Sequence, residues 1–194
     1  MNRHLLTTLA VVLLTAVGMC QNKSTRKNRE YKSANGNRVV IVPVGAEGES
    51  RVVFFDSSNK RMCTADYASS DGSHGFVVAK AQWTPDQRFF VYSMTSSGGH
   101  QPWHAPTEFV DRDNHQLCHL DDFFGSSGVA TTDFKLIAPN TVLTALDLEM
   151  RPVTTSLDTL LKKNGTTKKT GCVPCNIGGV LIFGDTTPYE HSPN

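Results

Sequence analysis

Two thirteen-residue segments of the chain resemble each other closely enough to constrain its fold. They read FFDSSNKRMCTAD (54–66) and FVDRDNHQLCHLD (109–121), and each holds Asp and Asn residues in its middle. Because these side chains hydrogen-bond nearby backbone groups and tolerate left-handed dihedral angles, each segment predicts a β-hairpin. A further strand pattern precedes each segment, NGNRVVIVPV and PDQRFFVYSM. Supersecondary units that recur along a chain indicate a repeat architecture.

The remainder of the chain also favours strands. Short runs of β-branched and aromatic residues are bounded by Gly, Asn, Asp, Ser or Pro, and no long amphipathic helix pattern interrupts them. A weaker third copy begins at APNTVLTALDL (138–148), and SLDTLL (156–161) fits either a helical turn or another strand. We therefore expect an all-β fold of about three blade-like antiparallel repeats, in a single domain over residues 38–194.

The stretch WTPDQRFFVYS (83–93) resembles the blade signature W-S-P-D-G-(R/K)-x-(I/L)-x-(F/Y) of TolB-type β-propellers, with Gln87 where those proteins usually have glycine. The resemblance is strongest over residues 81–121. It implies an exported envelope protein that makes protein contacts, and it carries over no catalytic residues. At roughly 40–45 residues per blade, the chain holds about three blades. A closed propeller typically needs four or more, so we expect a monomeric partial propeller or a sandwich-like stack.

The N-terminal residues 1–19 have the pattern of an export signal. Arg3 precedes an uncharged apolar run over residues 5–17, and small residues follow at Ala16 and Gly18. A run of 13 residues is shorter than the roughly 20 that a membrane-spanning helix requires. The signal predicts export to the periplasm or the cell envelope.

Two endings of this signal fit the sequence. Cleavage after Gly18 would release a free protein, whereas Val17-Gly18-Met19-Cys20 resembles a bacterial lipoprotein box in which Cys20 is lipidated. Lipidation of Cys20 would leave four of the five cysteines, an even number for an oxidising compartment. The polar, Lys- and Arg-rich residues 20–37 then predict a flexible tether.

The charge balance gives no global attraction for nucleic acid. The chain has 19 Lys and Arg against 18 Asp and Glu, and removal of the signal takes away Arg3 and no acid. A neutral domain has no long-range field with which to collect polyanions. We expect no nucleic-acid partner, and membrane contact only through a lipid on Cys20.

The loop SSGGHQPWHAP (96–106) is the candidate binding site. It brings His100, Trp103 and His104 close together in sequence after a flexible Gly-Gly pair. Aromatic anchors dominate the energetics of protein interfaces, so these three residues predict a recognition patch for an envelope protein or a glycan. In the alternative interpretation, Trp103 fills a gap between blades and the histidines hydrogen-bond the loop.

Two enzymatic alternatives start from histidine and cysteine. Five histidines cluster in sequence and are candidate zinc ligands, although their i, i+4 spacing has meaning only on a helix: His74, His100, His104, His115 and His119. Cys172 and Cys175 form a CxxC, for which we expect a structural disulfide between the two, with a redox pair as the alternative. No G-x-S-x-G nucleophile motif occurs. We expect a non-catalytic binding module that uses no cofactor or metal.

Overall fold

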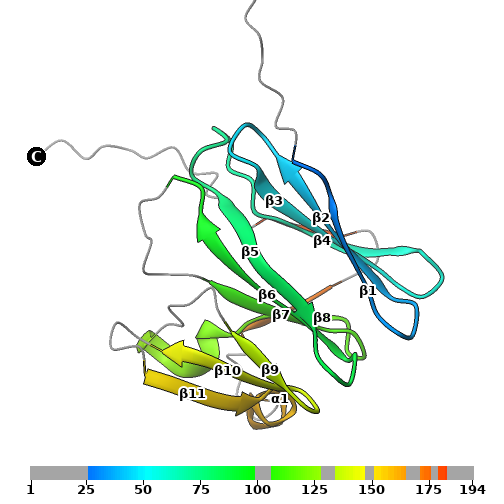
Figure 1. Cartoon of the computed structure of the whole chain (residues 1–194), viewed down its shortest axis with the longest axis vertical. Coiled ribbons are helices and arrows are strands. Elements are labelled where there is room, and N and C mark those ends of the chain that lie inside the picture. Colours follow the sequence, from blue (N-terminus) through cyan, green and yellow to red (C-terminus); the bar gives the residue numbers. More distant parts are fainter. Residues whose placement is uncertain are drawn as a thin grey trace, which may run out of the picture.

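Three β-sheets form successive layers in the computed structural model, which describes residues 26–98, 106–127, 134–146, 151–164, 171–175 and 179–182 (Figure 1). The first sheet has the order β1 (Arg29–Lys32), β2 (Arg38–Val44), β3 (Glu49–Phe55), β4 (Arg61–Asp66) and β13 (Gly179–Ile182). The central sheet has the order β5 (Phe76–Trp83), β6 (Phe89–Ser96), β7 (Thr107–Asp111), β8 (Gln116–His119) and β12 (Cys172–Pro174). The third sheet has the order β9 (Lys135–Ile137), β10 (Thr141–Leu146) and β11 (Arg151–Ser156). All described strand pairs are antiparallel except β4 with β13, and the expected all-β, sandwich-like fold is confirmed.

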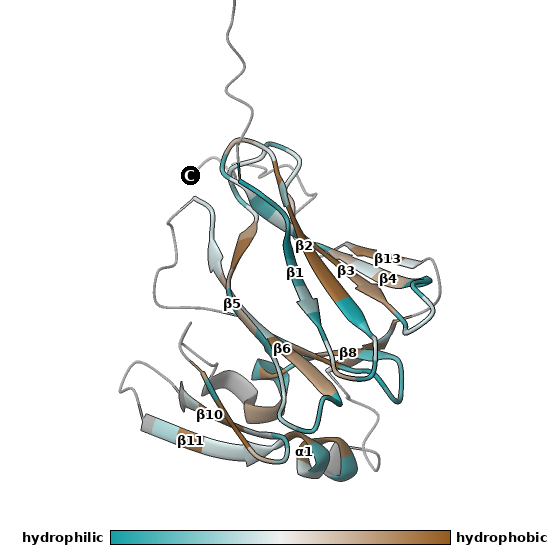
Figure 2. Cartoon of the chain, turned by 45° about the vertical axis from the view of Figure 1, so that its right-hand side comes forward, coloured by the Kyte–Doolittle hydropathy of each residue, from teal (hydrophilic) through white to brown (hydrophobic). Residues whose placement is uncertain are grey.

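Two hydrophobic clusters hold the layers together, one on each face of the central sheet. Alternate residues of β6 supply them: Phe90 and Tyr92 pack against the first sheet, whereas Phe89 and Val91 pack toward the third. Successive side chains of a strand point to opposite faces, so a strand apolar at every position is one buried on both sides. Figure 2 shows hydrophobic stretches within the strands of the sheets and hydrophilic turns at several strand ends. The central sheet therefore lies between the two hydrophobic clusters.

Two short helices complete the described structure, a 3-10 helix η1 (Asp121–Ser127) and an α-helix α1 (Leu157–Asn164). The segment SLDTLL divides at its first residue, because β11 ends at Ser156 and α1 begins at Leu157. Leu157 and Leu160 lie three positions apart on one helix face and are buried against the central sheet. Within the described ranges, no helix combines the length and apolar character needed to cross a membrane.

The two predicted hairpins have matching structures. Phe54 lies opposite Cys63, and Phe109 lies opposite Cys118. All four side chains are buried, and each pair faces the sheet that follows in the stack. The preceding strands are offset from the sequence alignment, since Val39 and Val91 are the residues that pair with Phe54 and Phe109.

The same chemistry closes both hairpin turns. The Asp56 carboxylate accepts hydrogen bonds from the backbone N–H groups of Ser58 and Lys60, both at 2.9 Å. Asp111 accepts from the N–H groups of Asp113 and Asn114 at 3.0 and 3.3 Å. Side-chain acceptors of this kind replace backbone partners in tight turns.

The turn before β6 contains a left-handed residue although it lacks glycine. Gln87 has φ 61°, the left-handed conformation that favours glycine, and Gly36 has φ 86° in the corresponding turn of the first sheet. Gln87 N–H donates to the Thr84 carbonyl at 2.8 Å, as Gly36 N–H donates to the Ser33 carbonyl at 3.1 Å. The turns at Gln87 and Gly36 are therefore equivalent.

The predicted disulfide between Cys172 and Cys175 is wrong. Cys172 bonds to Cys118 of the central sheet, and Cys175 bonds to Cys63 of the first sheet. The two cysteines of the CxxC are therefore bonded to two different sheets. The physical reason is that residues 172–174 form strand β12 beside β8. An extended strand holds residues three positions apart at roughly 10 Å, beyond the roughly 7 Å limit on Cα separation in a disulfide.

The predicted tether is also corrected, for residues 29–37. Residues 29–32 form β1, which pairs antiparallel with β2. Tyr31 packs edge to face on Phe90, with 5.4 Å between ring centroids, and its carbonyl accepts a hydrogen bond from the Trp83 indole at 3.3 Å. One aromatic anchor and a row of backbone hydrogen bonds are sufficient to hold an otherwise polar strand. Residues 20–25 of the predicted tether, including Cys20, lie outside the described residues.

Candidate functional site

The candidate binding loop, residues 96–106, connects β6 to β7 of the central sheet. His100, Trp103 and His104 lie outside the described residues, so the structure shows where the loop is attached. A loop carried by a rigid scaffold is the usual position for binding residues. The attachment therefore decides how firmly the three predicted contact residues are presented.

Both ends of this loop are fixed by hydrogen bonds. The Met94 N–H donates to the Pro106 carbonyl at 2.9 Å, which closes the base of the loop across β6 and β7. The Ser97 N–H donates to the Gly75 carbonyl at 2.9 Å. These bonds tie the loop to the connection between β4 and β5 as well as to its own sheet.

A buried carboxylate organises this end of the molecule. Glu49, at the start of β3, has no exposed surface. It accepts hydrogen bonds from the Ser97 hydroxyl at 2.7 Å, the Gly75 N–H at 2.6 Å and the Ser69 N–H at 2.7 Å. Burial by itself would raise the pKa of Glu49, but the hydrogen bonds from Ser97, Gly75 and Ser69 outweigh burial and lower it. Glu49 is therefore an ionised clamp that joins β3 to the β4–β5 and β6–β7 connections.

Glycine is required beside this clamp. A Cβ atom at Gly75 would lie 2.3 Å from the Tyr67 carbonyl oxygen and 2.7 Å from the Glu49 carboxyl carbon. Since the first of these contacts is with backbone, any side chain at this position would push the β4–β5 connection away from the Glu49 carboxylate.

Replacing Glu49 with glutamine is expected to lower the free energy of unfolding at pH 7 by about 2 kcal/mol, the usual contribution of hydrogen bonds to a charged group. A folded-state pKa below the unfolded value makes the contribution of Glu49 complete above about pH 4.3. The contribution is lost as pH falls through the folded pKa. Urea unfolding at pH 7 and at pH 3 should show the difference between native protein and variant shrinking in acid.

Glu47→Gln is the matched control, because Glu47 is exposed and lies two positions before Glu49, in the β2–β3 connection. Its effect should stay within about 0.5 kcal/mol at either pH. An equal loss of stability in the two variants would contradict the clamp.

Three connections have described residues at this end, and we call those residues the loop end: residues 45–48, 67–75, 97–98 and 106. A Cβ atom on Gly45 would lie 3.8 Å from the Gly72 Cα, which shows that the first two connections are neighbours. Figure 1 places the β2–β3 and β4–β5 connections together at the top of the view. The loop end is thus a composite surface built from both large sheets.

His74 contributes an exposed imidazole to the loop end. Its Nδ1 atom lies within hydrogen-bond distance of the Asp71 carboxylate and 3.2 Å from the Ser73 hydroxyl. A serine nucleophile would need to meet the other ring nitrogen, Nε2, while the carboxylate held Nδ1. Here Ser73 and Asp71 approach the same nitrogen, so the group has the geometry of a polar surface cluster and not of a catalytic triad.

A second polar cluster lies within the core between the first and central sheets. Tyr67 and Tyr92 both donate to the Glu108 carboxylate, the latter at 2.9 Å. His119 Nδ1 lies 3.0 Å from the other carboxylate oxygen. Burial, followed by the charge of Glu108, raises the pKa of both tyrosines well above 10. They act as neutral hydrogen-bond donors that keep a buried carboxylate in place.

The Glu108 carboxylate also affects the imidazole. Its hydrogen bond to His119 raises the pKa of His119, with burial acting in the opposite direction. A raised pKa means that the His119–Glu108 pair stabilises the fold below about pH 6.5, and that this stabilisation is lost as pH rises through the folded pKa. The described contacts of Glu108 and His119 give the pair a structural role.

Of the five candidate zinc ligands, the three that lie in the described residues are not brought together. His74 pairs with Asp71 at the loop end, His119 pairs with Glu108, and His115 occupies a hairpin turn with φ 52°. No group of three or more His, Cys, Asp or Glu side chains that could hold a metal ion occurs among the described residues. The i, i+4 spacing of His115 and His119 has no ligating meaning because it spans a turn and a strand.

Sequence reasoning missed two of the buried carboxylates, Glu49 and Glu108. Glu49 and Glu108 look like ordinary surface acids, since each stands among polar and apolar residues in a short strand. The available signal was in TEFVD, where the Glu108 side chain must share a face with Val110 if the strand alternates. Its partners come from β6, from β8 and from Tyr67, the residue after β4, so no local pattern could have found them.

The fold and the loop end define a class of protein. It is an all-β sandwich, cross-linked by two disulfides, in which connections of the first and central sheets form one surface. Comparison with known protein families, curated protein sequences and solved structures finds no match.

Proposed function

We propose that this protein is an exported binding module of the cell envelope that recognises another envelope protein or a glycan through the loop 96–106. The observation that carries the proposal is the fixation of Ser97 and Pro106 at the two ends of the loop. Fixed ends reduce the entropy that the loop loses on binding, which is how a rigid scaffold improves affinity. His100, Trp103 and His104 are the contact residues of this proposal.

The disulfides support export. Both disulfides join segments far apart in sequence, with separations of 112 and 54 residues, and such bonds persist in oxidising compartments.

Strands β1–β4 and strands β5–β8 each form a four-stranded antiparallel meander, which is the composition of a propeller blade. The meanders support the resemblance to TolB-type modules. We further propose that Cys20 carries the lipid that holds the protein at the membrane.

The double variant Trp103→Ala/His104→Ala tests the binding loop. Pull-down of the full chain from envelope extract identifies candidate partners, and each purified candidate, protein or glycan, is then titrated against native protein and variant. Loss of an aromatic anchor and its neighbour is expected to weaken binding at least about tenfold.

Lys135→Ala/Ile137→Ala is the control, because both side chains are exposed on β9 in the third sheet. It should bind every partner with native affinity. Retention of all partners at native affinity by the Trp103→Ala/His104→Ala variant would overturn the proposal in favour of a structural envelope protein.

A further inference from the structure

A basic groove opens between the first sheet and β5, at the end of the molecule where the described chain begins. Its volume is ≈ 350 Å³. Three cations line it, Arg26, Lys27 and Arg29, and none of the residues that line it in the described part of the chain is acidic. The side chains of Ile41, Pro43, Val77 and Val78 provide an apolar floor.

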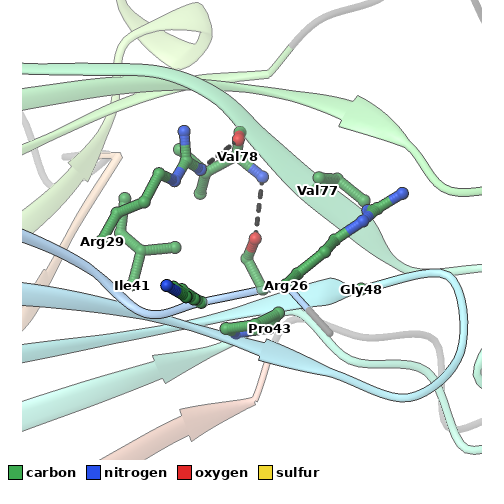
Figure 3. Close-up of a pocket in the computed structure, with 9 residues that line it drawn as sticks. Arg26, Arg29, Ile41, Pro43, Gly48, Val77 and Val78 are labelled. Atoms are coloured by element: carbon green, nitrogen blue, oxygen red, sulfur yellow. Dashed lines mark hydrogen bonds between the residues drawn. The ribbon is translucent and has the colours of Figure 1, made fainter. Parts of the chain in front are cut away.

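The two arginines are held across the groove by backbone carbonyls. Arg26 Nη1 donates to the Glu47 carbonyl at 2.6 Å, and Arg29 Nη2 donates to the Val78 carbonyl. Figure 3 shows Arg29 extending toward Val78 and Arg26 toward Val77. The Ser50 hydroxyl accepts from the Val78 N–H at 2.8 Å, which ties the two walls together. The two arginines are thus positioned by the fold.

The Arg26 side chain also depends on a glycine. A Cβ atom at Gly48 would lie 2.5 Å from Arg26 Nη1, and Gly48 has φ 72°. The missing side chain lets the guanidinium lie directly over the β2–β3 connection. This close approach brings the charge of Arg26 to the rim of the groove.

We propose that the basic groove binds the phosphate of an anionic phospholipid headgroup. Guanidinium and ammonium groups are the side chains that bind phosphate oxygens, and an apolar floor suits the glycerol and first acyl carbons of a lipid. Each basic residue near an anionic surface strengthens membrane association about fivefold.

The position of the groove favours a lipid over a free phosphate, and this step rests on the proposed lipidation of Cys20. Only residues 21–25 separate Cys20 from Arg26. Because a residue spans at most about 3.6 Å, the Cα atom of Arg26 would lie within roughly 22 Å of an anchored Cys20. The groove would then lie within reach of the headgroup layer.

The test uses the full chain with Cys20→Ser, so that binding does not depend on a lipid anchor. Sedimentation with vesicles of phosphatidylglycerol and phosphatidylcholine is compared with sedimentation with phosphatidylcholine alone. Native groove residues should give binding to the anionic vesicles that weakens as salt is added. Arg26→Gln/Arg29→Gln should weaken this binding at least about tenfold.

Lys27→Gln serves as a second variant that removes no described hydrogen bond, and it should weaken binding about fivefold. The control is Lys60→Gln/Lys135→Gln, which removes two exposed charges elsewhere and should change binding less than twofold. An equal loss in groove and control variants, or equal binding to both kinds of vesicle, would overturn the proposal.

Isothermal titration with glycerol 3-phosphate separates the two sources of phosphate. Groove-dependent binding of this soluble compound without vesicle binding would overturn the lipid assignment and indicate a soluble phosphate ligand. The mass of the mature N-terminal peptide of the native chain tests lipidation of Cys20 separately. Failure of that assignment would leave the vesicle result intact.

Discussion

Replacing Cys63 and Cys175 with alanine is expected to lower the free energy of unfolding by about 4 kcal/mol. The bond spans a sequence separation of 112 residues, and the intact Cys118–Cys172 bond shortens the effective closed path to roughly half of this. A loop of that size loses about 4 kcal/mol of chain entropy when it is cross-linked in the unfolded state. Urea unfolding of native protein and variant measures the difference.

Cys118→Ala/Cys172→Ala is the matched comparison, because it removes the equivalent bond of the central sheet. Its separation of 54 residues predicts a similar loss. Removing both bonds should cost more than either alone and prevent stable folding. Peptide mapping of the unreduced protein provides a direct check: a peptide containing Cys63 should be linked to one containing Cys175. A Cys172–Cys175 link, or a loss below about 1 kcal/mol, would contradict the structure.

The hairpins could be predicted from the sequence because their chemistry is local. Asp56 and Asp111 close their turns with backbone groups two to four residues away. The alternation of apolar residues then decides which side chains are buried. The sequence does not decide the structure of residues 156–161, since these six residues satisfy both a helical and an extended pattern.

The disulfide pairing could not be predicted because it depends on contacts between sheets. Cys172 and Cys175 are close in sequence, and closeness suggested that they bond to each other. The order of the central sheet places β12 beside β8, so that Cys172 meets Cys118 directly across the strand pair. Cys175 then lies in the first core cluster with Cys63. Only the tertiary arrangement supplies this information.

The basic segment shows a similar limit. Composition identified residues 20–37 as polar and charged, which is correct, and predicted a tether from that alone. Tyr31 packs on Phe90 because a second sheet lies behind β1, and composition does not reveal that sheet. The groove formed by Arg26, Lys27 and Arg29 follows from that packing and has no signature in the sequence.

Arg88→Met is expected to lower the free energy of unfolding at pH 7 by about 3 kcal/mol or more. Arg88 donates to both oxygens of Asp111, at 3.3 and 2.9 Å, and also to Asp158 at the start of α1. The Asp111 side chain is fully buried, whereas that of Arg88 is 26% exposed. Removing one member of a buried pair leaves an uncompensated charge, which costs about 3–5 kcal/mol.

The hydrogen bonds around Arg88 also join the central sheet to the third sheet. Asn140 donates to Asp86, in the turn before β6, and to Asp158, both at 2.8 Å. The Pro-Asp turn of the central sheet therefore lies against the Pro-Asn turn of the third sheet, the two sequences that looked alike. Loss of Arg88 should loosen this layer contact as well as the β7–β8 turn.

Arg51→Met is the matched control for Arg88→Met. Arg51 also donates two hydrogen bonds to one carboxylate, both to Oδ2 of Asp66 at 2.9 and 2.7 Å, but its side chain is 43% exposed. Exposed ion pairs contribute about 1 kcal/mol or less. A loss in Arg51→Met as large as that in Arg88→Met would show that burial of Asp111 is not the cause.

The pH dependence separates loss of charge pairing from loss of packing. Burial would raise the pKa of Asp111, but the hydrogen bond from Arg88 and then that from Asn114 lower it. In the native protein this stabilisation is present above about pH 4 and is lost as pH falls through the folded pKa of Asp111. In Arg88→Met, protonation of Asp111 relieves the unpaired charge, so the difference from native protein should shrink between pH 7 and pH 3. A difference that stayed constant over this range would assign the effect of Arg88 to its contact with the Phe89 ring, at 4.6 Å, rather than to Asp111.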